Sequence, residues 1–355
     1  MPDNAIATGQ ADYVLPPAEM PAQIMSYVAQ ALDKPFKTHS VFVPQSEDAL
    51  KKIIVQLRNH TGHDFSQYKP NTLYRRIERR MAVHQIQTLE GYVKYLQQNT
   101  AEAEALFLDL LIRVTSFFRD SEAFQALEQQ VVPQLLAQKP EQESVRIWVP
   151  GCSTGEEAYS LAILLAEHQQ SLGQARNVLV FATDIDGRAI ATARTGRYPS
   201  SIASDITPQR LKRFFIPDQD DSTYQVCQEI RDTVIFSEHS VSKDPPFSKL
   251  DLISCRNLLI YMKAELQEKI LSIFHYVLNP QGYLFLGTSE SVGERSDLFT
   301  VVDRQAKLYQ GQDHFAPVHQ AIWGVHSPFP KVPEDKFVLS STKTGGSPKK
   351  SLREL

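Results

Sequence analysis

The spacing of hydrophobic residues divides the chain into a helical part and a part in which strands and helices alternate. Between residues 46 and 136, apolar side chains recur at helical intervals, as at Leu73, Ile77 and Met81, which predicts an all-helical N-terminal domain. From 137 to 312, short apolar runs alternate with helical stretches, in the order that a parallel sheet with crossover helices requires. The predicted fold class is therefore α/β, with a Rossmann-like domain following the helical one.

The same pattern predicts the individual elements. Helices of the first domain are expected from Ser46 onward and at residues 71–83, 89–98 and 102–112. Strands of the second domain are expected at 146–149, 178–182, 250–254 and 282–286, with a hairpin-like return at 308–310. Residues 196–238 break the alternation with a helix at 208–215 and short strands at 223–227 and 233–236. We expect this stretch to be a small inserted β-subdomain over the C-terminal edge of the sheet.

The two ends of the chain fit neither domain. Residues 1–35 contain a short strand candidate and, at 18–32, an amphipathic helix. A strand this short needs a sheet to join, so the segment is either a flexible leader or a piece of something longer. Residues 313–355 are rich in proline and end in lysine, serine and glycine, which predicts a disordered tail or linker.

The strongest chemical signal begins at the first strand of the second domain. The run Val145–Pro150 predicts a buried strand, Gly151–Gly155 a tight turn, and the residues from Glu157 onward a helix. Strand, glycine turn and helix form the first half of a nucleotide-binding βαβ unit. Asp184 follows the next strand, where an acidic side chain can accept hydrogen bonds from ribose hydroxyls.

The turn differs from the dinucleotide-binding pattern, because its sequence is G-C-S-T-G instead of G-x-G-x-x-G. Glu156 and Glu157 complement the helix dipole but would repel a phosphate. A ligand with positive charge and a ribose, such as S-adenosylmethionine, fits these residues better, and a nicotinamide-dependent oxidoreductase is disfavoured. An ordinary α/β turn with glutamates in its first helical turn remains the alternative.

Composition narrows the class of protein. A length of 355 residues predicts about two domains plus tails, and the net charge of -4 gives no argument for nucleic acid. The three cysteines are widely spaced, without a paired metal-ligand pattern, which indicates a reducing compartment and no metal site. Neither a secretion signal nor an apolar run of about 20 residues is present. We therefore expect a cytoplasmic protein without membrane insertion.

Four arginines gather on one side of the predicted helix at 71–83. They are Arg75, Arg76, Arg79 and Arg80. The common explanation for such a run is a charged face exposed to solvent. The more specific hypothesis is a docking surface for an acidic partner. Nucleic acid is disfavoured because aromatic residues are not interleaved.

Several longer motifs resemble one known family, the CheR chemotaxis receptor methyltransferases. The motifs are Val114–Asp120, Gly151–Glu157, Ala182–Asp186, Ser254–Tyr261 and Leu278–Glu290. The resemblance covers residues 46 to 312 and implies a methyltransferase domain that uses S-adenosylmethionine. It implies methyl transfer to glutamate side chains of chemoreceptors, giving glutamate methyl esters and S-adenosylhomocysteine. The alternative is a weakly active, cofactor-binding signalling module.

The start of the chain resembles a different family. Residues 5–17 are similar to the last strand and helix of CheB receptor methylesterases. Long fusion proteins join esterase, methyltransferase and sensory modules in that order. The resemblance therefore implies that the chain is a segment of such a fusion.

The resemblance also assigns roles to individual residues. Contacts to the cofactor fall on Thr115, Arg119, Gly151, Glu157 and Asp184, with Cys255 and Arg256 near the adenosine. Arg119 and Tyr261 are candidates for the catalytic centre, and the arginine helix is the candidate for receptor binding. The family commonly has asparagine where this chain has Arg113 and at the Ser240–Val241 position, which puts cofactor affinity in doubt. The turn at 217–221 lacks the glycine-containing insertion of members that bind a receptor tail, so tail docking is not expected.

Overall fold

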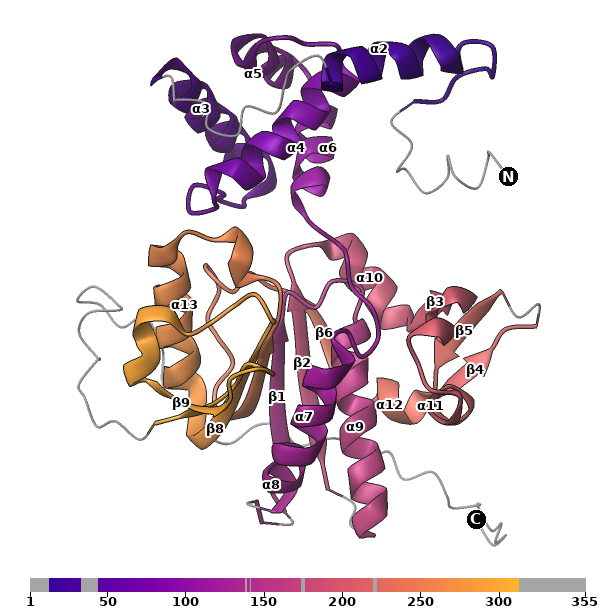
Figure 1. The fold of residues 1–355 in the computed structure, drawn as a ribbon, viewed down its shortest axis with the longest axis vertical. Helices are drawn as coiled ribbons and strands as arrows, with labels where there is room; N and C mark the ends of the chain where they lie inside the picture. Colours follow the sequence, from indigo (N-terminus) through magenta and orange to yellow (C-terminus); the bar gives the residue numbers. More distant parts are fainter. Residues whose placement is uncertain are drawn as a thin grey trace, which may run out of the picture. The chain divides into compact units, whose positions relative to one another are not determined.

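A computed structural model describes residues 13–32, 44–137, 139–140, 142–173, 176–219 and 222–312 (Figure 1). The strand candidate near residues 5–17 lies largely outside these residues, and the predicted tail at 313–355 lies wholly outside them. The predicted helix at 18–32 is present as α2 (Met20–Leu32). Within the described ranges, no helix combines the length and the apolar character that crossing a membrane requires.

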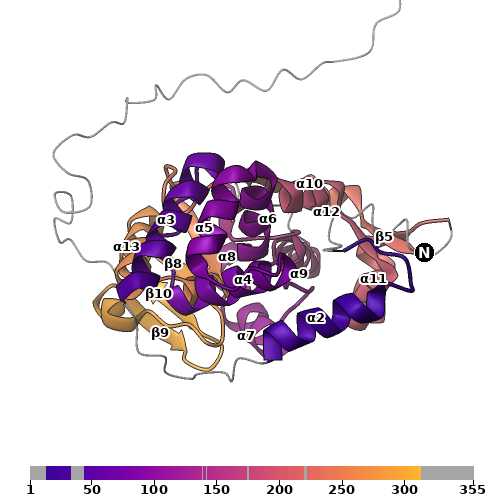
Figure 2. The same cartoon turned by 90° about the horizontal axis from the view of Figure 1, so that it is seen from above.

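The helical unit is built from α3 (Pro44–Thr61), α4 (Pro70–Val83), α5 (Leu89–Gln98) and α6 (Thr100–Leu110). Figure 2 shows these helices lying together. The predicted stripe of α4 is confirmed, since Leu73, Ile77 and Met81 are buried in one cluster. Helix α5 begins where the Thr88 hydroxyl accepts a hydrogen bond from the Gly91 amide at 3.1 Å, as an N-cap does. Helix α2 contacts α4, and the Tyr13 hydroxyl donates to the Val83 carbonyl.

The described strands of the second unit form a seven-stranded sheet in the order β6-β2-β1-β7-β8-β10-β9. Their bounds are β1 (Val145–Pro150), β2 (Val178–Asp184), β6 (Val234–Glu238), β7 (Leu250–Cys255), β8 (Leu278–Leu286), β9 (Phe299–Asp303) and β10 (Leu308–Gly311). The strands from β6 to β8 are parallel, while β10 is antiparallel to both β8 and β9. The predicted parallel sheet with an antiparallel return is confirmed.

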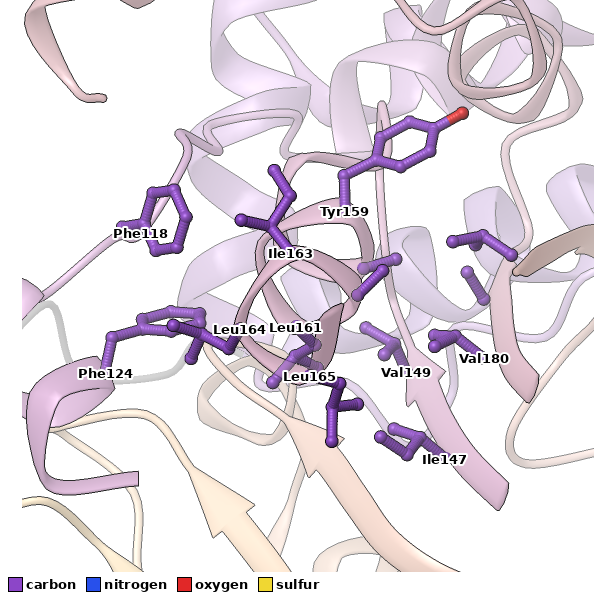
Figure 3. Packing of buried hydrophobic residues seen from close by; sticks show 14 of the residues in the cluster. Phe118, Phe124, Ile147, Val149, Tyr159, Leu161, Ile163, Leu164, Leu165 and Val180 are labelled. Carbon is purple, nitrogen blue, oxygen red and sulfur yellow. The ribbon is translucent and has the colours of Figure 1, made fainter. Parts of the chain in front are cut away.

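Helices cover both faces of this sheet (Figure 1). Because side chains alternate along a strand, Ile147 and Val149 of β1 pack on one face and Trp148 on the other. The first face is covered by α7 (Ser121–Gln130), α8 (Val132–Ala137) and α9 (Glu156–Leu172). The second is covered by α13 (Ala264–Val277). Figure 3 shows Leu161, Ile163, Leu164 and Leu165 of α9 between the strands and the rings of Phe118 and Phe124.

Two predicted boundaries are wrong. The helical domain was expected to reach residue 136, but Phe124, Leu127 and Leu135 of α7 and α8 pack in the core of the sheet. A helix that covers a sheet has the same apolar spacing as a helix in a bundle, so periodicity cannot separate the two.

The inserted subdomain is also shorter than the predicted range 196–238. Its own sheet has the order β3-β5-β4, from β3 (Arg197–Pro199), β4 (Phe215–Pro217) and β5 (Thr223–Val226), with α11 (Pro208–Phe214) alongside. Strand β6 instead pairs with β2 in the large sheet, where Val234 and Phe236 are buried and Ile235 is exposed. That alternation is typical of an edge strand. A strand of a small hairpin shows the same short alternating pattern, so the sequence could not tell which sheet β6 joins.

Candidate active site

A cavity of about 530 Å³ lies where the parallel strands end at their carboxyl side, which is where open α/β sheets bind ligands. Its volume is within the range of sites for small molecules. The structure brings together here six of the residues predicted from the sequence: Arg113, Gly151, Asp184, Ser240, Val241 and Tyr261. The cavity therefore joins segments that lie far apart along the chain.

Asp184 presents a half-buried carboxylate to this cavity. Its oxygens accept hydrogen bonds from the Ser153 amide at 2.8 Å and from the Asp186 amide at 2.9 Å. Burial nevertheless raises the pKa of Asp184, and the nearby Asp186 acts in the same direction. Each carboxylate oxygen has more than one lone pair, so Asp184 can still accept hydrogen bonds from a bound ligand.

Gly151 allows the chain to turn sharply at the end of β1. Its φ of +73° lies in the left-handed region, and an added Cβ would stand 3.0 Å from the Leu258 side chain. A larger residue would be strained and would displace Leu258, which lines the same cavity. Gly151 therefore allows the close approach of these two loops.

The helical unit supplies part of the cavity wall through residues 62–68, including His63 and Tyr68. The Lys69 amide donates to the Tyr261 carbonyl at 2.8 Å, and the Lys263 amide donates to the Gln67 carbonyl at 2.8 Å. Burial, together with the charge of Asp184, raises the pKa of Tyr68 to about 12. These wall residues were missed from the sequence, because the pairing of distant segments leaves no periodic signal.

Glu157 marks a second part of the site, away from the cavity. Its carboxylate accepts a hydrogen bond from the Ser254 hydroxyl at 2.7 Å and lies 3.8 Å from the Arg256 guanidinium. Burial raises the pKa of Glu157, whereas the charges of Arg256 and Arg119 act in the opposite direction. A buried carboxylate with a raised pKa is stabilised by an added cation.

Other predicted residues are not among those that line the cavity, namely Thr115, Arg119, Cys255 and Arg256. Cys255 is completely buried at the end of β7. The Arg119 guanidinium donates to the Val114 carbonyl at 2.8 Å. Arg113 forms an ion pair with Asp186, and Asp186 also caps α10 (Gly187–Thr195).

Glu290 is a site residue to which the sequence motif gave no role. Its buried carboxylate accepts hydrogen bonds from the amides of Asn257 at 2.8 Å, Gly287 at 2.7 Å and Ile260 at 3.2 Å. These bonds hold the loop that follows β7 and carries Tyr261. The only sequence signal for it was its position at the end of the motif Leu278–Glu290.

The predicted four-arginine docking face is wrong in part. Arg80 is buried and donates to Glu102 through Nε at 2.9 Å and Nη2 at 2.6 Å. Arg79 forms an ion pair with Asp109. Position 80 follows Ile77 by three residues and therefore falls on the buried stripe. Arg75 remains exposed and Arg76 half-buried.

The residues present fit S-adenosylmethionine. Two half-buried carboxylates have raised pKa values: Asp184 at the end of β2 and Glu157 in the first turn of α9. One can accept ribose hydroxyls and the other can hold a cationic group, while Gly151 allows a ligand to lie against the backbone. The cavity beside Asp184 is large enough for a nucleoside.

Comparison with known proteins identifies the family. Residues 113–308 match the CheR methyltransferase SAM-binding domain, and residues 48–111 match the CheR methyltransferase all-alpha domain. The two matches meet where the packing changes from the helical cluster to the core of the sheet.

Three relatives illustrate the similarity. An uncharacterized 104.1 kDa protein of Rhodobacter capsulatus is 36% identical over 330 residues, which cover 87% of this chain and 34% of that protein. A putative methyltransferase, Cher3, of Pseudomonas putida is 34% identical and covers 70% of this chain and 91% of its own length. Chemotaxis protein methyltransferase 2 of Vibrio cholerae is 32% identical, covering 68% of this chain and 84% of its own length. The chain thus spans about a third of the first relative, and it belongs to the CheR methyltransferase family.

Proposed function

We propose that this chain transfers a methyl group from S-adenosylmethionine to glutamate side chains of chemoreceptors, forming glutamate methyl esters. The observation that carries the proposal is the pair of half-buried carboxylates, Asp184 and Glu157, in a domain that matches the SAM-binding domain of the family. Relatives named as chemotaxis protein methyltransferases support the same reaction.

S-adenosylmethionine, when bound, supplies a methyl group on a positively charged sulfur. Asp184 would accept hydrogen bonds from the ribose, and Glu157 would hold the ammonium of the methionine end. Arg119 would pair with a carboxylate, either that of the methionine end or that of the incoming glutamate. Tyr261, on the loop held by Glu290, lies at the cavity wall and completes the candidate catalytic centre.

The acceptor glutamate needs no general base, because a carboxylate is already ionised at neutral pH. The task of the protein is therefore to align the acceptor with the methyl group and to exclude water. Residues 62–68 of the helical unit cover one side of the cavity, which supports a role in water exclusion. This chemistry is consistent with a site built from carboxylates and arginines.

Receptor docking is proposed for the exposed part of the arginine helix. Arg75 and Arg76 remain available on α4, whereas Arg79 and Arg80 are engaged within the helical unit. Receptor methylation segments are helical and rich in glutamate, so their charge is complementary to this surface. The chemoreceptor is thus the proposed partner and the cytoplasm the proposed location.

A fused methylesterase and sensory modules are proposed for the parent protein. The support is the resemblance of residues 5–17 to the end of a CheB methylesterase. The large Rhodobacter capsulatus relative, of which this chain covers 34%, is consistent with additional modules.

Methyl incorporation tests the proposed activity. The full chain is incubated with labelled S-adenosylmethionine and a receptor cytoplasmic fragment, and the labelled product is treated with base. We expect base-labile label on the fragment and none on a fragment whose acceptor glutamates are replaced by alanine. Binding of S-adenosylhomocysteine without any label transfer would instead support the signalling-module alternative.

The cofactor assignment has its own test. Asp184→Ala should weaken S-adenosylhomocysteine binding about tenfold or more, because a charge-assisted hydrogen bond contributes about 1.5–3 kcal/mol. Calorimetry on the folded variant measures this. Asp303→Ala is a suitable control, because this carboxylate also accepts two backbone hydrogen bonds, from Gln305 at 2.8 Å and Ala306 at 2.9 Å, and is not among the residues that line the cavity. Unchanged affinity in Asp184→Ala would rule out the ribose contact.

A further inference from the structure

Arg256 occupies an unusual position at the end of β7. Its side chain is 0% exposed, and its guanidinium carbon lies 4.7 Å from the ring centroid of Phe285 and 5.1 Å from that of Phe124. Arginine is almost never fully buried unless it is paired. The guanidinium therefore packs against two aromatic rings, and its polar contacts must come from other side chains.

The polar contacts of Arg256 reach two different segments. Its Nη2 donates to the Asp120 carboxylate at 2.7 Å, and its Nη1 lies 3.8 Å from the Glu157 carboxylate. Among the described residues, Nε and Nη1 have no hydrogen-bond partner. One strong bond, to Asp120, therefore provides most of the pairing for this buried charge.

Asp120 is held in a conformation that favours this bond over helix capping. It stands at the N-cap of α7 with φ 58° and ψ 66°, and its side chain makes no cap hydrogen bond. An aspartate at this position usually accepts from the amides of the first helical turn. Its left-handed backbone is a conformation that aspartate adopts more readily than most residues. The carboxylate therefore makes its hydrogen bond with Arg256 and not with the first turn of α7.

The residue next to Asp120 is Arg119, a candidate for the catalytic centre. Its guanidinium donates to the Val114 carbonyl at 2.8 Å, and its charge acts to lower the pKa of Glu157. The preceding residue, Phe118, also has a left-handed φ of 50°, and its amide donates to the Ser160 hydroxyl at 3.0 Å. The path of the segment 117–120 is therefore fixed from both sides, by α9 through Ser160 and by β7 through Arg256.

We propose that Arg256 is a positioning residue that acts through Asp120 to hold Arg119 against the Glu157 end of the site, and that its side chain does not contact the adenosine. This inference rests on the proposed use of S-adenosylmethionine. It assigns a role to the bond between Arg256 and Asp120 in addition to the role of Arg119 itself.

A double-mutant cycle tests the proposal by calorimetry with S-adenosylhomocysteine on the full chain. Asp120→Asn removes the charge of the partner but keeps a residue that accepts left-handed backbone. We expect it to weaken binding about tenfold in the unmodified chain, as the loss of one charge-assisted bond predicts. In an Arg119→Ala background the same substitution should weaken binding less than about twofold, because the residue that it positions is already gone.

The outcome distinguishes a role of the Arg256–Asp120 bond in positioning Arg119 from a role only in the stability of the fold. A merely structural role for the bond would give the same fold-change in both backgrounds, and that result would overturn the proposal, as would normal binding by Asp120→Asn. Arg256→Lys, which keeps the charge but loses the planar fork, should behave like Asp120→Asn if it folds. Arg80→Lys, in the other buried arginine–carboxylate pair, is the matched control and should bind normally. Failure of the unmodified chain to bind would overturn the proposed function and this inference together.

Discussion

The two units of the protein each contain a buried arginine paired with carboxylates, and the two arginines are used differently. In the helical unit, Arg80 makes a two-pronged contact with Glu102, whose carboxylate also accepts from the Tyr92 hydroxyl at 2.6 Å. In the second unit, Arg256 makes one hydrogen bond to Asp120 and leaves Nε and Nη1 without a hydrogen-bond partner among the described residues.

The difference indicates that Arg80 has a structural role, whereas Arg256 belongs to the proposed cofactor site. The contacts of Arg80 and Glu102 described above join α4, α5 and α6 and hold those helices together. The Arg256 group links β7, the start of α7 and the start of α9, all at the proposed cofactor site. A fully satisfied buried network stabilises a fold, whereas an unsatisfied buried polar group is costly and calls for an explanation. At Arg256 the explanation that we propose is the positioning of a neighbouring segment.

The largest expected effect is on the stability of the helical unit. Arg80→Ala leaves the Glu102 carboxylate buried without its counter-ion, which should lower the free energy of unfolding by about 3–5 kcal/mol. Urea denaturation measures this loss. Arg75→Ala on the exposed side of the same helix is the control and should change stability by less than about 0.5 kcal/mol. Equal stability of the two variants would contradict the structural role of Arg80.

The pH dependence of this effect follows from the pKa of Glu102. Burial alone would raise that pKa, but the hydrogen bonds from Arg80 and Tyr92 outweigh it and the pKa is lowered. A lowered pKa gives stability that is present above the ordinary pKa of glutamate and is lost as the pH falls through the lowered value. The stability difference between the unmodified chain and Arg80→Ala should therefore shrink in acid.

An intermediate effect is expected at Glu157, with opposite signs for stability and for binding. Because burial raises its pKa, the stability that this group contributes is complete below the ordinary pKa of glutamate and is lost as the pH rises through the raised value. Glu157→Gln mimics the protonated form, so the ligand-free variant should lose less stability than the unmodified chain between mildly acidic and neutral pH.

Binding by Glu157→Gln should fall in the same experiment. S-adenosylhomocysteine keeps the ammonium group, and loss of a charge-assisted bond to it should cost about 1.5–3 kcal/mol. Thermal unfolding against pH and calorimetry measure the two effects. Glu156→Gln is the matched control, because the Glu156 carboxylate accepts from the Thr154 hydroxyl and starts the same helix. If both variants bind alike, Glu157 has no special role.

The smallest expected effect concerns Arg75, which is exposed, and Arg76, which is half-buried. Replacing Arg75 and Arg76 by glutamate should raise the KM for the receptor fragment and leave cofactor affinity unchanged, since exposed ion pairs contribute about 0.2–1 kcal/mol each. The effect should fade with added salt, because attraction is screened over about 8 Å at physiological ionic strength. A normal KM at low salt would show that this surface is only solvated.

The central strands could be predicted well from the sequence, whereas the edge strand and the packing partners of two helices could not. Strands β1, β2, β7 and β8 are apolar runs in the middle of a sheet, where burial on both faces gives a strong signal. The role of β6 was missed because an edge strand alternates and is short. Helices α7 and α8 were assigned to the wrong domain because their apolar spacing does not record which partner they pack against.

The site was predictable only where a residue sits in a local motif. Gly151 follows β1 directly and Asp184 ends β2, so their place at the sheet edge comes from the strand assignment. The burial of Arg80 could also have been predicted, because position 80 follows Ile77 by three residues on the helix. The contribution of Tyr68 to the cavity wall and the bonds of Glu290 depend instead on contacts between segments far apart along the chain. No spacing rule within one segment could have shown them.

The backbone hydrogen bond between Lys69 and Tyr261 has a mechanical consequence. Lys69 is the N-cap residue of α4, and Pro70 fixes the backbone of the first turn. Tyr261 belongs to the loop that Glu290 anchors. The helix that carries Arg75 and Arg76 is therefore joined at its first residue, through one backbone hydrogen bond, to the loop that carries a candidate catalytic residue.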